Sequence, residues 1–68
     1  MKSLCGKEFA RLIERYGWTL ARINGSHHIY IKKGRIERVS IPIHGNESLK
    51  TGLQKHLMKI IGLTDDDL

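Results

Sequence analysis

The chain has 68 residues and a formal net charge of +5, from twelve Lys and Arg against seven Asp and Glu. This length allows one domain, residues 1–68, and the single cysteine, Cys5, excludes an internal disulfide and a cysteine-based zinc site. Three of the acids are Asp65–Asp67, so the rest of the chain sets twelve cations against four acids, which is typical either of a protein that binds nucleic acid or of a solvated basic surface.

The first predicted element is a helix over Lys7–Tyr16. Its apolar residues recur at intervals of three and four and form one face: Phe9, Leu12, Ile13 and Tyr16. We expect this face to lie in the core. Gly17 is expected to end the helix, as glycine commonly does after a helix.

Three strands are predicted next, because β-branched and aromatic residues alternate with polar ones between turn signals. The predicted ranges are Trp18–Asn24, His27–Lys33 and Ile36–His44. Short turns at Gly25-Ser26 and Gly34-Arg35 predict an antiparallel meander. In the third strand, Val39, Ile41 and Ile43 share one face, and Pro42 favours an edge position because it has no N–H.

A second helix is predicted over Lys50–Ile61, with an apolar face of Leu53, Leu57, Ile60 and Ile61. Thr51 and Gln54 have the spacing of a capping box, and Gly62 is expected to end the helix. The fold class is therefore α+β, with the order α-β-β-β-α and a three-stranded antiparallel sheet. Two amphipathic helices cover one face of such a sheet and leave the other face to water or to a partner.

Alternation places His27, Ile29 and Ile31 on one face of the second strand, and His28, Tyr30 and Lys32 on the other. We expect the two isoleucines to face the core, which puts His28, Tyr30 and Lys32 on the uncovered face. Arg38, Ser40 and His44 of the third strand share that parity. Cations there suit phosphates, a tyrosine suits an unpaired base, and a histidine suits proton transfer.

Simpler roles remain open for the histidines. His28 has the features of an ordinary exposed histidine as well as those of a catalytic one, and His27 suits a half-buried structural role. His27 and His28 diverge on a strand, so they do not share a metal ion without distortion, and His44 and His56 have no carboxylate at ligand spacing. We therefore expect no metal and no cofactor. A nucleophilic Ser26 lacks an acid to orient the histidine.

Four phrases of the chain, "GKEFARLIERYGW", "GSHHIY", "IPIHG" and "GLQKHLMKIIGL", resemble the HicA (YcfA-like) family of toxins in their order and spacing. The resemblance covers nearly the whole chain. It implies the fold of double-stranded RNA-binding domains, cleavage of mRNA as an mRNA interferase, and inhibition by a HicB-like antitoxin encoded nearby. The family histidine in its Gly-Ser-x-His phrase corresponds to His28.

On this basis we expect a cytoplasmic endoribonuclease of a type II toxin–antitoxin system, monomeric when free and hetero-oligomeric with its antitoxin. No apolar run is long enough for a membrane span or signal peptide. His28 is the expected general acid or base, and the second proton-transfer group is left open among Tyr30, Lys32 and His44. The expected RNA-binding residues are Ser26, Tyr30, Lys32, Lys33 and Arg38.

Two other function classes use the same fold and charge. A non-catalytic module would grip double-stranded RNA by its shape, and such recognition does not need an imidazole. A protein-binding subunit would have no affinity for RNA.

Overall fold

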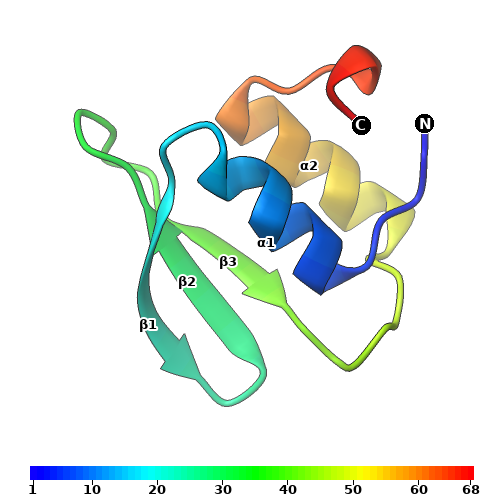
Figure 1. Cartoon of the computed structure of the whole chain (residues 1–68), viewed down its shortest axis with the longest axis horizontal. Helices are drawn as coiled ribbons and strands as arrows, with labels where there is room; N and C mark the ends of the chain where they lie inside the picture. Colours follow the sequence, from blue (N-terminus) through cyan, green and yellow to red (C-terminus); the bar gives the residue numbers. More distant parts are fainter.

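A computed structural model describes all 68 residues, in the element order predicted from the sequence. The main elements are α1 (Gly6–Glu14), β1 (Thr19–Asn24), β2 (His27–Ile31), β3 (Val39–Pro42) and α2 (Thr51–Ile61), followed by a 3-10 turn, η1 (Asp65–Asp67). The strands form one antiparallel sheet in the order β1-β2-β3. Figure 1 shows both helices on one side of this sheet, with β1 at the edge farthest from them. The predicted α+β fold is confirmed.

The strands are shorter than predicted. A glycine lies in each of the two connections, Gly25 between β1 and β2 and Gly34 between β2 and β3. Gly25 and Gly34 both have positive φ, of 63° and 84°, which residues with a Cβ adopt at a cost. Pro42 lies at the end of the edge strand β3, as its missing N–H predicts. Neither helix has the length and apolar content that a membrane span requires.

Helix α1 is two residues shorter at its end than predicted. Phe9 and Ile13 are fully buried, as expected, but Tyr16 lies beyond the helix and is 43% exposed. Its hydroxyl donates a hydrogen bond to Asp67 Oδ1 at 2.7 Å. The prediction that Tyr16 belongs to the core is therefore wrong, because the helix ends at Glu14 before the next turn can bring Tyr16 over the sheet.

Gly6 allows the start of α1 to sit directly on the end of β3. A Cβ at this position would collide with the carbonyl oxygen of Pro42. Cys5 precedes the helix and is buried, and its backbone N–H donates to the Glu8 carboxylate at 3.0 Å. That bond lowers the pKa of Glu8 below its usual value. The first turn of α1 is thus fixed against the sheet.

Helix α2 has no capping box at Thr51 and Gln54, contrary to the prediction. Lys50 is the N-cap residue and makes no side-chain capping bond. Gln54 is fully buried instead, where its Oε1 accepts from the Leu4 N–H at 3.0 Å and its Nε2 donates to the Lys2 carbonyl at 2.7 Å. The amide therefore ties α2 to the N-terminal segment. Gly62, with a φ of 90°, ends the helix as predicted.

The predicted faces of β2 are wrong, because the register with β3 inverts them. Tyr30 pairs with Val39 and His28 pairs with Ile41, and directly paired residues of antiparallel strands point to the same side. Val39 and Ile41 are buried under the helices, and so is Tyr30, which is 3% exposed. We call this side the covered face. The opposite side, the open face, carries His27, Ile29 and Ile31 in β2 and Ser40 in β3.

Candidate functional site

His28, the predicted catalytic residue, lies on the covered face near the start of β2 and is half-buried. Its cross-strand neighbours are Ile23 of β1 and Ile41 of β3. The imidazole makes no hydrogen bond, so both ring nitrogens are free to contact a ligand or water. His28 therefore does not lie on the open face as predicted, but its partial exposure leaves the ring accessible.

An exposed apolar strip borders His28 on the side of β1. Leu20 and Ile23 pair with Tyr30 and His28, which places them on the covered face, yet they are 45% and 56% exposed. Helix α1 explains this exposure, because it packs on β3 and reaches Tyr30 of β2 but leaves β1 uncovered (Figure 1). The part of the covered face that belongs to β1 is therefore exposed to solvent, next to His28.

Tyr30 is a core residue and not a platform for an RNA base. Its hydroxyl donates a hydrogen bond to Glu14 Oε2 at 3.1 Å, across the interface between β2 and the end of α1. Burial, assisted by that carboxylate, raises the pKa of Tyr30 to about 12. The predicted stacking role depended on the inverted face assignment and does not fit a ring that is 3% exposed.

The predicted RNA-binding cations are at the other end of β2, around the loop between β2 and β3. Lys32, Lys33 and Arg38 line one shallow cavity of about 580 Å³ there, together with Thr19, Ile31, Arg35, Ile36 and Glu37. Lys32 lies four residues beyond His28, a separation of about 13 Å along a strand. The cations therefore form a group at the opposite end of β2 from His28.

Arg35 fixes this loop to the body of the protein. Its Nη2 donates to the Ile60 carbonyl at 2.6 Å, its Nε pairs with Glu37 at 2.9 Å, and its guanidinium lies 5.7 Å from the centre of the Trp18 ring. Ile36, the next residue, is 96% exposed. Sequence reasoning missed both residues, since nothing local distinguishes a loop arginine that anchors from one that is free.

Ser26 lies in the turn between β1 and β2, where it meets the end of β3. The Ile43 N–H donates to the Ser26 carbonyl at 2.8 Å, and Ser26 Oγ lies 3.4 Å from His44 Nε2. On the open face, His27 Nδ1 lies 3.2 Å from Ser40 Oγ. The structure thus brings together the two histidine-containing phrases, "GSHH" and "IPIHG", which are far apart in the sequence.

A cavity of about 400 Å³ lies where these phrases meet the start of α2, and we call it the His27–His44 cavity. Its lining residues are His27, Pro42, His44, Glu47, Ser48, Leu49, Lys50 and Leu53. No group of three or more His, Cys, Asp or Glu side chains is placed to hold a metal ion. The spacing of the histidines in the sequence did not predict this cavity, because its lining residues come from three separate segments of the chain.

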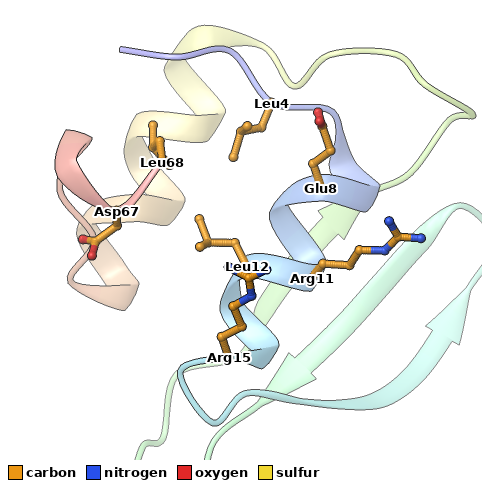
Figure 2. A pocket seen from close by; sticks show the side chains of 7 residues that line it. All are labelled: Leu4, Glu8, Arg11, Leu12, Arg15, Asp67 and Leu68. Carbon is orange, nitrogen blue, oxygen red and sulfur yellow. The ribbon is translucent and has the colours of Figure 1, made fainter.

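A further hollow lies between α1 and the C-terminal residues, away from the histidines. Figure 2 shows Leu68 and Leu12 facing each other across it, with Arg11 extending away from Asp67. Asp67 accepts bonds from Thr64 and Tyr16, and these bonds lower the pKa of its carboxyl group. None of the predicted site residues lines this hollow.

Comparison with known proteins gives one family match. Residues 6–63 match a family model described as the HicA toxin of bacterial toxin–antitoxin. No curated protein matches the chain. The matched residues include all five strands and helices of the sheet domain and both histidine-containing phrases.

Proposed function

The chain belongs to the HicA toxin family of bacterial toxin–antitoxin systems, and from this premise we propose that it is an endoribonuclease that cleaves mRNA. The toxin role follows from the family. The cleavage reaction, the residues that perform it and a cytoplasmic location are our proposal. The observation that carries it is a family match over 58 residues that contains a partly exposed histidine, His28, with unoccupied ring nitrogens.

The proposed reaction uses the nucleophile that RNA itself contains. The 2′-hydroxyl attacks the adjacent phosphorus, the new O2′–P bond forms, and the P–O5′ bond breaks to leave a 2′,3′-cyclic phosphate and a 5′-hydroxyl. A base must take the 2′ proton and an acid must supply one to the 5′ oxygen. His28 is the proposed group for one of these transfers, which are each worth about 10²–10⁴-fold in rate.

The surface charge supports RNA as the substrate class. Lys32, Lys33 and Arg38 gather around the β2–β3 loop, where only Glu37 is acidic and its carboxylate is paired with Arg35. When lysine and arginine side chains contact phosphates, counterions that were condensed on the RNA are released, and this favours binding at low salt. We propose that this loop holds the RNA strand away from the cleavage point, about 13 Å along β2.

The family also implies an antitoxin partner. We propose that a HicB-like antitoxin binds the free toxin, which is otherwise monomeric, in a hetero-oligomer. The exposed Leu20 and Ile23 beside His28 give such a partner an apolar surface that it can bury while it blocks the histidine. The basic character of the chain favours an acidic partner surface.

The test is cleavage of a defined RNA by the purified protein and by His28→Ala, with His56→Ala as a matched control. His56 is exposed on α2, outside the two histidine-containing phrases. We expect His28→Ala to lose cleavage by about 10²–10⁴-fold while His56→Ala cuts normally. Full cleavage by His28→Ala would reject the assignment, and inhibition by EDTA would reject a metal-independent reaction.

A non-catalytic module that binds double-stranded RNA is the second candidate, favoured by the fold and the basic loop. It predicts tight binding to an RNA duplex with no fragments at any enzyme concentration. The same cleavage experiment separates it from the nuclease.

A further inference from the structure

We propose that the His27–His44 cavity is a phosphate-binding subsite for the RNA, distinct from His28. This inference rests on the proposed function, because it assigns a second contact to the same substrate. His27 and His28 are consecutive on β2, so their side chains leave the strand on opposite faces. The open-face histidine reaches a cavity that also contains a second imidazole and a lysine, whereas His28 has apolar cross-strand neighbours.

The two imidazoles of the cavity are held in place by serine hydroxyls. Ser40 Oγ lies 3.2 Å from His27 Nδ1, and Ser26 Oγ lies 3.4 Å from His44 Nε2. Each contact uses one ring nitrogen and leaves the other, Nε2 of His27 and Nδ1 of His44, without a partner in the protein. The serine contacts thus orient two rings that keep a free nitrogen each.

The cavity is lined by charged side chains of both signs and by the two imidazoles. Lys50 supplies one positive charge and Glu47 one negative charge, and no salt bridge joins them. The remaining titratable groups that line the cavity are His27 and His44. Their free ring nitrogens lie in the same cavity as the ammonium group of Lys50, so the cavity offers an anion hydrogen-bonding groups and one positive charge.

A phosphodiester matches these groups better than a metal or an apolar ligand. Two N–H donors and an ammonium group complement the oxygens of a phosphate, and hydrogen bonds to charged groups are stronger than neutral ones. The cavity lies next to Pro42, which pairs with His27 at the end of the sheet. An RNA strand with a phosphate at every nucleotide can therefore place one phosphate here and another near His28, around the same end of β2.

The test measures binding and turnover separately. Binding uses a fluorescent RNA oligonucleotide with 2′-deoxy sugars at each cleavage position, so that it stays intact, at one fixed pH and salt concentration. A second arm titrates inorganic phosphate and follows the imidazole signals by NMR. The variants are His27→Gln, His44→Gln and Lys50→Gln, with His56→Gln as a control outside the cavity, and circular dichroism checks the fold of each.

We expect His27→Gln, His44→Gln and Lys50→Gln each to weaken binding of this RNA by about tenfold, the effect of about one hydrogen bond to a charged group. His56→Gln should bind the RNA as the intact protein does. On cleavable RNA, His27→Gln and Lys50→Gln should raise KM and leave kcat unchanged. Phosphate should shift the signals of His27 and His44 and not those of His56.

Three outcomes would overturn the inference. Unchanged RNA affinity in all three cavity variants would show that the cavity does not contact RNA. A shift by free phosphate without any change in RNA affinity would reduce it to a small-anion site. A fall in kcat at constant KM in His27→Gln or His44→Gln would make the cavity the cleavage centre. Loss of the proposed nuclease function would appear separately, as absence of cleavage by the intact protein, and would leave the binding measurements valid.

Discussion

Successive residues of β2 point to opposite faces of the sheet, and these two faces differ in burial and in polar contacts. On the covered face Tyr30 is 3% exposed and bonded to Glu14, and His28 lies half-buried beside Ile41. On the open face Ile31 is 41% exposed and His27 contacts only the Ser40 hydroxyl among polar groups. The contrast teaches that hydrophobicity within a strand does not decide its buried side when both sides carry apolar residues.

The neighbouring strand decided which face is covered. Val39 and Ile41 are both apolar and lie on the same side of β3, so that side is the one that is buried. They pair with Tyr30 and His28, which places these two residues on the buried side as well. A tyrosine adapts to burial because its ring packs while its hydroxyl finds a partner, here Glu14. On the open face Ile29 is half-buried, and the exposed Ile31 is tolerated because a single exposed apolar side chain costs a folded protein little.

The largest difference between the faces is expected in stability. Tyr30→Ala removes a fully packed aromatic ring and should cost about 3–5 kcal/mol, which equals the whole stability of a domain this small. Ile31→Ala should cost less than about 1 kcal/mol because the side chain already contacts water. Urea denaturation followed by circular dichroism measures both. A larger loss for Ile31→Ala than for Tyr30→Ala would reverse the assigned faces.

The two adjacent histidines allow the same comparison with one side-chain type. His28→Ala should lower the free energy of unfolding by about 1–2 kcal/mol, and His27→Ala by less than about 0.5 kcal/mol. In a domain of this size 1 kcal/mol corresponds to a change in Tm of about 4–8 °C. Thermal denaturation at pH 7.5 measures this difference, which is opposite to the order expected from the sequence. Equal melting temperatures would show that His28 is not packed.

The loop beyond β2, which belongs to neither face, is expected to dominate the salt dependence of RNA binding. Each phosphate contact contributes about 0.7–0.9 to the slope of log K against log salt. Lys33→Glu should therefore reduce the slope by about one contact or more, whereas Lys59→Glu on the exposed side of α2 should leave it unchanged. Fluorescence anisotropy from 50 to 300 mM salt, roughly the range over which such binding weakens, provides the slopes. Equal slopes would remove the loop from the RNA-binding surface.

The smallest effect concerns the Tyr30 hydroxyl on the covered face. Its pKa of about 12 lies above the usual value near 10, so the folded state holds this proton more tightly than the unfolded state. The resulting stability is complete below pH 10 and is lost as the pH rises from 10 towards 12. Tyr30→Phe should cost about 0.5–1.5 kcal/mol at pH 7 and show a weaker decline above pH 10.

Urea denaturation of the unmodified protein and of Tyr30→Phe between pH 8 and 11.5 measures the stability that depends on the Tyr30 proton. Tyr16 is present in both proteins, so its contribution cancels in the comparison. A parallel decline in the two proteins would mean that Tyr30 ionises as it does in the unfolded chain.

Much of the fold was predictable, because apolar periodicity is unambiguous where only one side of an element is apolar. Phe9 and Ile13 in α1 and Val39 and Ile41 in β3 are such positions, and all four are buried. The prediction failed where a local pattern had two solutions. Gln54 fitted a capping box by spacing, but its amide instead satisfies backbone groups of Lys2 and Leu4 that lie 50 or more residues away.

The candidate site was predictable in its residue types and not in their grouping. His28, Ser26 and the loop cations were named from the sequence, but they occupy three places: the covered face, the turn before β2 and the loop after it. Ser26 and His44 are 18 residues apart, and only the pairing of β2 with β3 brings them together.

The sequence by itself determined the order of helices and strands, the glycine that ends α2 and the family, because these depend on local periodicity, on φ preferences and on short phrases in register. The tertiary structure alone decided which face of β2 is buried, and with it the surroundings of His27 and His28. A strand has a side-chain period of two, so its own pattern offers two equivalent orientations. The choice between them depends on cross-strand partners and on helices that lie far away in the chain.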